Sequence, residues 1–373
     1  MKTNKLIKYG IIFIFIAIGF FAVSIAFGSL NEDTWNSVAK KSLAKSGYYE
    51  TQIEEYEEIE QSEILNLSVK LTDGNFFLRR AASAEQEKIT VKYYESFEGE
   101  FSLALDGDGI YKIKQNDIGW YRNMLYDNIF AQIYRLRNFK RDFTVTVPQG
   151  FDFKSLEIEG DNGKADVSGF ENGLNLQKIK LDNGSLTMKD VNITADGFTF
   201  ILNNGKANIE NSEAKGITGS CDNGSITLKD ITVSGSLSLK SNNGRISAEK
   251  IEAGGLVKMN TDNGRIDIKG LECGSVEMKS NNGRINVENV KAPGLIKMDC
   301  DNGRINIVNI TGGNIELKAN NGSIVLTNLI NAGQYKFVLS ANNGSKKNEY
   351  ANAENAVYTL TAKVDNGSVT IKK

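Results

Sequence analysis

The feature that most constrains the fold is a short triplet, Asp-Asn-Gly or Asn-Asn-Gly, which occurs eleven times between residues 161 and 367 at intervals of 19 to 23 residues. A fixed period of this length indicates a stacked-repeat architecture. We expect each triplet to form a corner whose asparagine adopts a left-handed conformation and hydrogen-bonds to its equivalents along the stack. These corner asparagines are Asn162, Asn183, Asn204, Asn223, Asn243, Asn263, Asn282, Asn302, Asn321, Asn343 and Asn366.

Apolar residues fall at constant distances from each corner glycine. They stand two, four and seven residues after it, and seven and five residues before the next one. After Gly264, for example, these positions hold Ile266, Ile268 and Leu271, followed by Val276 and Met278. This alternation predicts two short strands in each repeat, joined by two corners, with five buried aliphatic side chains.

Asn-Gly is also a strong hairpin signal, so an antiparallel meander is the alternative to a solenoid. The polar positions between the corners distinguish the two, because their charge alternates from repeat to repeat. Five residues after the glycine the chain reads Lys229, Glu249, Lys269, Glu288, and six before it Lys258, Glu277, Lys297, Glu316. Parallel stacking makes opposite charges neighbours. We therefore predict an all-β fold, a single-stranded parallel β-solenoid of about ten coils.

The residue that opens each triplet alternates as well, running Asn203, Asp222, Asn242, Asp262, Asn281, Asp301, Asn320. The alternation implies a doubled unit of two coils. Residues 242–280 align with residues 281–319 without a gap. A two-coil duplication accounts for both observations.

The N-terminal region differs from the repeats. Residues 10–30 form an uncharged apolar run, long enough for a transmembrane helix. Three lysines precede this run and acidic residues follow it, which predicts a cytoplasmic tail at 1–9 and an extracytoplasmic remainder. A cleavable signal peptide is the competing interpretation. We assign 31–147 to a juxtamembrane stalk and a mixed β capping region, and 148–373 to the solenoid.

Composition narrows the possible chemistry. Histidine is absent, which removes the commonest general base and zinc ligand. The triplets lack the spaced acidic ligands of calcium loops, so we predict no metal and no cofactor. A net charge of -2 gives no general attraction to nucleic acid. The three cysteines, Cys221, Cys273 and Cys300, cannot all pair within one chain.

One column of basic residues is a candidate binding site. Arg245, Arg265, Arg284 and Arg304 each follow a corner glycine, so stacking places them about 4.8 Å apart. Such a column suits a polyanion such as an anionic cell-wall polymer, because guanidinium groups bind phosphate and carboxylate bidentately. The alternative is that these arginines offset the charge of Asp262 and Asp301.

The repeated corners, the GxIxI strands and the Val-Thr-Val-Pro-Gln-Gly segment at 145–150 resemble the bacterial "putative adhesin" family of β-strand-repeat proteins. The resemblance implies a β-solenoid. The family includes membrane-anchored members associated with envelope stress. It supplies no catalytic residues.

These observations predict a non-enzymatic scaffold, anchored in the cell membrane, that presents the solenoid to an anionic polymer or to another envelope protein. The alternative is a regulatory or sensory subunit of an envelope-stress response. A polysaccharide-active β-helix enzyme is less favoured, because such an enzyme needs a non-repetitive cluster of catalytic groups. The acidic residues here recur at equivalent positions with charge partners.

Overall fold

A computed structural model describes residues 32–45, 47–49, 51–116, 134–135 and 137–373. The chain divides into two compact units. The described parts of 1–55, 94–100 and 116–140 form the first unit, and 56–93, 101–115 and 141–373 form the second. The predicted transmembrane helix at 10–30 lies outside the described residues. No described helix is long and apolar enough to cross a membrane.

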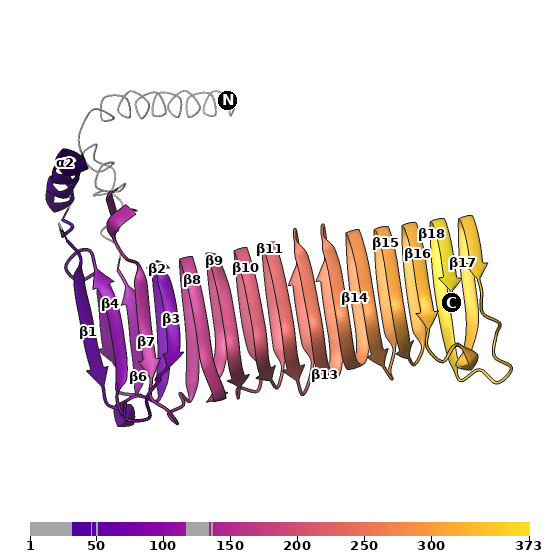
Figure 1. Ribbon diagram of the computed structural model, residues 1–373, viewed down its shortest axis with the longest axis horizontal. Helices are drawn as coiled ribbons and strands as arrows, with labels where there is room; N and C mark the ends of the chain where they lie inside the picture. Colours follow the sequence, from indigo (N-terminus) through magenta and orange to yellow (C-terminus); the bar gives the residue numbers. More distant parts are fainter. Residues whose placement is uncertain (1–31, 46, 50, 117–133, 136) are drawn as a thin grey trace. The chain divides into compact units, whose positions relative to one another are not determined.

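Strands make up nearly all of the second unit (Figure 1). In chain order the elements are α2 (Glu32–Lys45), β1 (Ile53–Ile59), β2 (Asn66–Asp73), β3 (Asn75–Arg80), β4 (Ile89–Glu95), β5 (Phe101–Leu105), β6 (Ile110–Gln115), β7 (Asp142–Val147), β8 (Ser155–Leu174), β9 (Leu176–Ile193), β10 (Phe198–Ala214), β11 (Ile217–Val233), β12 (Leu237–Ser241), β13 (Arg245–Thr261), β14 (Arg265–Ala292), β15 (Ile296–Gly312), β16 (Ile315–Leu329), β17 (Tyr335–Asn348) and β18 (Tyr358–Lys372), with 3-10 turns at Gln61–Glu63 and Ala332–Gln334.

Strands β8 to β16 pair in parallel, each with the next along the chain, and the corners stay in register. Gly205 pairs with Gly224, for example, and Gly283 with Gly303. The parallel β-solenoid predicted from the charges is therefore confirmed. The alternating charges become neighbours as expected: Lys229 Nζ lies 3.3 Å from Glu210 Oε1, and Lys258 Nζ lies 3.3 Å from Glu277 Oε1.

Each coil has three paired segments where the sequence predicted two. Between β13 and β14 they start at Arg245, Ile251 and Leu256. The extra bend comes six residues after the first nine corner glycines, where the backbone is left-handed with φ between 46° and 81°. These nine residues are Gly169, Asp190, Asn211, Asp230, Lys250, Gly270, Asn289, Asn309 and Asn328. The bend lets the chain turn within a coil while its neighbours keep pairing.

The core runs along the inside of the coils. The five predicted apolar positions are buried, as Ile266, Ile268 and Met278 illustrate. Two further positions point inward in most coils, nine residues after the corner glycine and three before the next one. In the same coil these hold Cys273 and Ser280. No coil can bury these side chains without its neighbours, so each depends on the stack.

The parallel stack continues before residue 148. Strand β2 pairs with β8, and Asp73 lies opposite Asn162, so Asp73-Gly74 occupies the place of another corner. Strands β6 and β7 pair with β2 and β3 as one further coil. Antiparallel pairing of β5 with β6 and of β4 with β7 then closes this end. Solenoid pairing thus reaches into the segment assigned above to a cap.

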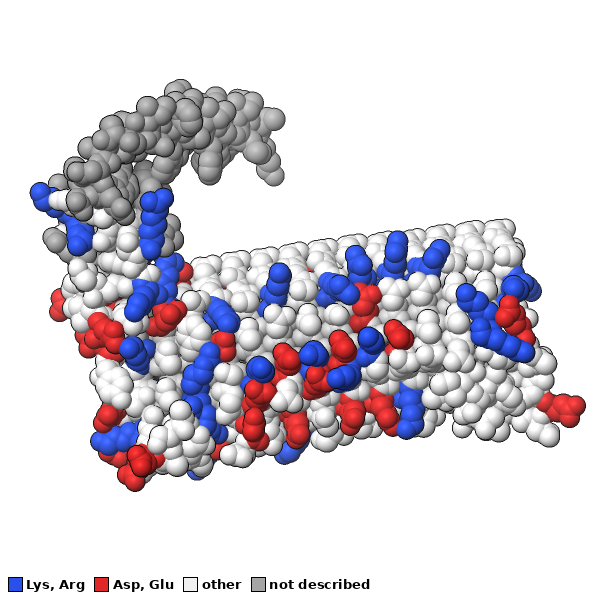
Figure 2. Space-filling view, viewed as in Figure 1, with Lys and Arg blue, Asp and Glu red and all other residues white. Residues whose placement is uncertain are grey.

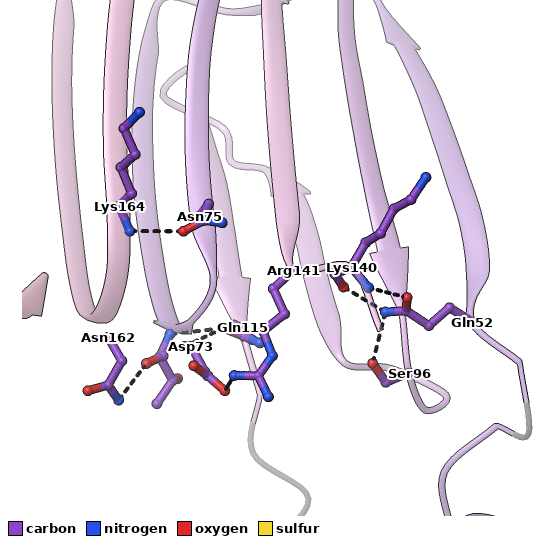
Figure 3. A network of polar contacts seen from close by, with 10 residues as sticks. Gln52, Asp73, Asn75, Ser96, Gln115, Lys140, Arg141, Asn162 and Lys164 are labelled. Carbon is purple, nitrogen blue, oxygen red and sulfur yellow. Dashed lines mark hydrogen bonds and ion pairs between the residues drawn. The ribbon is translucent and has the colours of Figure 1, made fainter. Parts of the chain in front are cut away.

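Polar contacts replace the corner of that first coil, where the chain departs after Gln115 and returns at Arg141 (Figure 3). Gln115 Oε1 accepts hydrogen bonds from the backbone N–H groups of Thr72, at 3.0 Å, and Asp73, at 2.8 Å. Arg141 Nη1 lies 2.5 Å from Asp73 Oδ2. These groups satisfy backbone donors that the next corner would otherwise cover.

At the other end the stacking departs from chain order. Strand β18 pairs with β16 on one side and with β17 on the other. The strand that comes last in the sequence therefore lies inside the stack, and β17 forms the end. Figure 1 shows β18 and β17 in this order.

The first unit has a small core of its own. Ala39 and Leu43 of α2 are buried with Tyr48, Phe97 and Tyr134. The Arg135 guanidinium lies 4.1 Å from the centre of the Tyr48 ring, a cation–π distance.

Candidate binding surface on the solenoid

The four predicted arginines do form one column on the outside of the solenoid. Arg245 pairs in register with Arg265, and Arg284 pairs with Arg304. Each directly follows a corner glycine, so each side chain leaves the coil at the same point of the turn. All four are exposed. We call this set the arginine column.

Two members of the arginine column have partners within the chain. Arg245 Nε lies 2.6 Å from Asp267 Oδ2, and Arg304 Nε donates to Ser323 Oγ at 2.9 Å. For Arg265 and Arg284 the described residues offer no hydrogen bond or ion pair. Two adjacent guanidinium groups in the middle of the column are therefore available to a ligand.

Asp262 and Asp301, the partners considered for the arginines, are engaged elsewhere. Asp262 Oδ1 accepts the amide of Asn281 at 2.9 Å, and Asp301 Oδ1 accepts the amide of Asn320 at 2.8 Å. Within the arginine column the one ion pair among the described residues is that of Arg245 with Asp267, which sequence reasoning did not single out.

The basic column is longer than predicted. Lys164 and Lys206 stand at the same position in earlier coils, and serine or arginine fills this position in the other coils with a corner triplet. Lys164 Nζ lies 2.5 Å from Asp166 Oδ2. Both lysines directly follow a corner glycine in the sequence. They were missed because only arginines were counted at this position.

Beside the arginine column the outer surface is shallowly hollowed. A depression of about 380 Å³ is lined by Arg245, Asp267 and Asn286, and by the alternating charges Glu249, Lys269 and Glu288. Basic and acidic side chains lie in bands along the length of the face in Figure 2. An extended ligand parallel to the solenoid axis would meet an arginine at each of four consecutive coils.

The eleven corner asparagines form a continuous hydrogen-bonded column, as predicted. Ten amide-to-oxygen bonds of 2.8–3.2 Å join each side chain to the next. The predicted left-handed conformation is wrong, because none of these eleven described residues has a positive φ. Their role is to satisfy amide groups along the stack, so they are structural.

Comparison with known proteins assigns the family. Residues 64–268 and 234–373 match the model of the Toastrack DUF4097 family. The chain belongs to this family. The match covers both the predicted solenoid and the coils before it. No curated protein sequence matches the chain.

Three of the solved structures that resemble this Toastrack chain are from Clostridium sporogenes, Bacteroides fragilis and Parabacteroides distasonis. A "putative cell adhesion protein" from Clostridium sporogenes is 10% identical, covers 86% of this chain and 99% of its own, and has a TM-score of 0.25. A "putative adhesin" from Bacteroides fragilis is 14% identical, with coverage of 86% and 96% and a TM-score of 0.28. A "putative lipid binding protein" from Parabacteroides distasonis is 14% identical, with coverage of 86% and 97% and a TM-score of 0.36. These scores are too low to support a function here.

The cysteines of this Toastrack chain lie in the core. All three are buried and unpaired with one another. Cys221 and Cys300 donate to the carbonyls of Gly205 and Gly283, both at 3.4 Å. Burial raises the pKa of Cys273 to about 12 and that of Cys300 to about 11. Thiols of this kind stay protonated at neutral pH and react slowly. In the described part of the chain no group of three or more His, Cys, Asp or Glu side chains could hold a metal.

The first residues of the triplets also stack in a column, and some of their side-chain oxygens lack a hydrogen bond. The side-chain oxygens of Asn242, Asn281 and Asn320 are buried and have no hydrogen-bond partner. In each case the next coil supplies an aspartate at this position: Asp262, Asp301 or Asp365. A carboxylate has no N–H to donate, so every second step along this column lacks a hydrogen bond.

Asp262→Asn is therefore expected to stabilise the protein. Its new amide can donate to the Asn242 oxygen, which adds about 1 kcal/mol to the free energy of unfolding and raises Tm by about 2 °C. Asp222→Asn is the matched control, since the coil before it carries Asn203, whose oxygen is not among the buried oxygens without a partner. Thermal unfolding followed by circular dichroism compares the two, and an equal Tm for both variants would contradict the explanation.

Proposed function

We propose that this protein is a non-enzymatic, adhesin-like scaffold that binds an extended anionic polymer along the arginine column. The observation that carries this proposal is the pair Arg265 and Arg284, which are adjacent, exposed and without a partner among the described residues. Exposed guanidinium groups at four consecutive coils suit a ligand whose negative charges also repeat.

The proposal includes a location. Residues 10–30 would anchor the chain in the cell membrane, with 1–9 in the cytoplasm and the solenoid outside, where anionic cell-wall polymers occur. The apolar run and the lysines before it support this orientation.

The absence of enzymatic activity is also part of the proposal. Outer carboxylates occupy repeated positions and contact basic side chains, as Glu210 contacts Lys229 and Glu277 contacts Lys258. Residues with this role stabilise the stack, so we assign none of these repeated carboxylates to acid–base chemistry. Incubation with cell-wall glycans tests this part, and turnover that a single Asp or Glu substitution abolishes would overturn it.

Replacing all four arginines of the column by serine is expected to weaken binding to a poly(glycerol phosphate) polymer by about thirtyfold. Four exposed ionic contacts of about 0.5 kcal/mol each contribute about 2 kcal/mol. Serine already occupies this position at Ser185 and Ser225, so the fold is retained. Binding is measured by co-sedimentation at several salt concentrations, and the wild-type affinity should fall as salt rises.

The matched control removes four charges from another column. Lys180, Lys240, Lys279 and Lys318 stand four residues before the corner glycines Gly184, Gly244, Gly283 and Gly322, and all four are exposed. Their replacement by serine changes the net charge by the same amount and should reduce binding far less. Equal losses in the two quadruple variants would mean that net charge, and not the arginine column, binds the polymer.

A further inference from the structure

Strand β18 is inserted into the stack out of chain order. Asn366 of β18 donates its amide to Asn321 of β16 at 2.8 Å and accepts the amide of Asn343 of β17 at 2.9 Å. The glycines give the same order, because a Cβ at Gly367 would meet the Gly322 carbonyl and one at Gly344 would meet the Gly367 carbonyl. The space between β16 and β17 is thus a slot that β18 fills.

A strand that fills the slot must have an apolar inner face and an Asn-Gly corner at a fixed register. The inner side of the slot is apolar, where Leu360, Ala362, Val364, Val369 and Ile371 of β18 are buried. The corners on both sides require an Asn-Gly pair at one register, since β16 and β17 align to the same residues of β18. A second copy of β18 meets these requirements, whereas an unrelated strand does not.

The residue that opens the triplet adds a further requirement. Asn342 of β17 donates its amide to Asp365 Oδ1 at 3.0 Å. With β18 in the slot, Asp365 lies between Asn320 and Asn342, so the alternation of Asp and Asn along the column continues. The position of β18 is therefore part of the repeat pattern.

An exposed link, residues 349–357, connects β17 to β18 along the chain. Residues 349–357 form no strand and most of them are exposed, Val357 to 68%. The link contacts β17, where Phe337 N–H donates to Asn352 Oδ1 at 2.7 Å and the Tyr350 ring stacks on Phe337. It also contacts β16 and β18, because Leu329 N–H donates to the Tyr350 hydroxyl at 3.2 Å and Glu349 N–H donates to the Ile371 carbonyl at 3.0 Å. A segment of this kind can act as a hinge.

We propose that two copies of this chain exchange β18, so that each β18 fills the slot between β16 and β17 of the other copy. The exchange keeps the pairing of β18 with β16 and β17 and changes the path and the contacts of the link, so it is a low-cost route to a dimer. Confinement to one membrane surface would favour the exchange by raising local concentration. The resulting pair carries two arginine columns, which increases avidity for a repeating ligand.

Crossed cysteines test the exchange. One full-length copy carries Glu316→Cys in β16, and a second, differently tagged copy carries Thr361→Cys in β18; the two positions pair in register. Neighbouring strands lie about 4.8 Å apart, which suits a disulfide. The native thiols are buried and do not interfere. After co-expression, detergent extraction and mild oxidation, we expect a disulfide-linked heterodimer.

An interior step of the stack provides the control. Copies with Lys297→Cys and Glu316→Cys present the same geometry between β15 and β16, which follow each other in chain order. Crosslinking between these copies would require more of the chain to detach, so its yield should be at least about tenfold lower. The double variant Glu316→Cys/Thr361→Cys in one chain shows that the pair can oxidise. Equal heterodimer yields for the crossed and interior pairs, while the double variant oxidises fully, would overturn the proposal.

Discussion

Gly264→Ala is expected to lower the free energy of unfolding by about 3 kcal/mol or more, among the largest losses for a single substitution in this protein. A Cβ at this position would lie 1.7 Å from the carbonyl oxygen of Gly244 in the preceding coil. The obstructing atom belongs to the backbone of a paired strand, so relief requires the two coils to move apart. Thermal unfolding by circular dichroism measures the loss as a fall in Tm of about 6 °C or more.

Gly197→Ala is the matched control, because it adds the same methyl group in a turn of the same solenoid. No heavy atom lies within 4 Å of a Cβ there. We expect its free energy of unfolding to stay within about 0.5 kcal/mol of wild type. A similar loss in both variants would show that general glycine flexibility, and not the close approach between corners, determines the effect.

The sequence identified the corner glycines correctly, but the reason expected from an Asn-Gly pair, a positive φ, applies to few of them. Asn-Gly suggests positive φ, yet only Gly163, Gly303 and Gly367 of the eleven corner glycines have one. The common requirement is the close approach of consecutive coils, since Cβ atoms at the corner glycines would lie 1.5–2.3 Å from a carbonyl oxygen of the neighbouring corner. A distance between residues about 20 positions apart is invisible in a local pattern.

The bend six residues after the first nine corner glycines was missed because no single residue marks it. Eight of its nine positions hold Asn, Asp or Gly, the residues that tolerate a left-handed backbone, and Lys250 is the exception. Mixed composition hides such a column from a search for one repeated residue. A search for the shared conformational property would have found it and would have predicted three segments in each coil.

The ends of the solenoid were hard to predict because insertions interrupt the period there. Asp73-Gly74 is separated from the triplet at Gly163 by strands and an insertion that belong to other parts of the fold. At the C-terminus the alternation of Asp and Asn did contain a signal. Chain order would place Asn320 beside Asn342, whereas the observed insertion of β18 places Asp365 between them.

The candidate site was predicted in part. The sequence placed Arg245, Arg265, Arg284 and Arg304 on one column, because the period alone determines which residues stack. It could not identify Asp267 as the partner of Arg245, since Asp267 lies in the next coil, two positions after the residue that pairs with Arg245. Side-chain partners depend on rotamers and on the spacing of coils, neither of which the period contains.

Replacing Lys346 by Ile and Asn348 by Val together is expected to make the exposed edge of β17 associate with the same edge of other copies. In β17 these residues align with Val369 and Ile371 of β18, which are buried core positions. A charge directed inward on an edge strand prevents edge-to-edge pairing. Apolar residues there would make β17 resemble an interior coil whose outer N–H and C=O groups lack partners.

Lys347→Ile is the control that distinguishes the effect of an inward-facing apolar side chain from that of added surface hydrophobicity. Lys347 aligns with Thr370, which faces outward between the two inward positions, so this variant also exchanges a lysine for an apolar residue on β17. Size-exclusion chromatography with light scattering should show concentration-dependent association for Lys346→Ile/Asn348→Val and a mass equal to wild type for Lys347→Ile. If the single outward substitution associates as strongly as the double inward one, surface hydrophobicity alone explains the result. If only the inward pair associates, the last coil ends the stack because polar residues occupy its core positions.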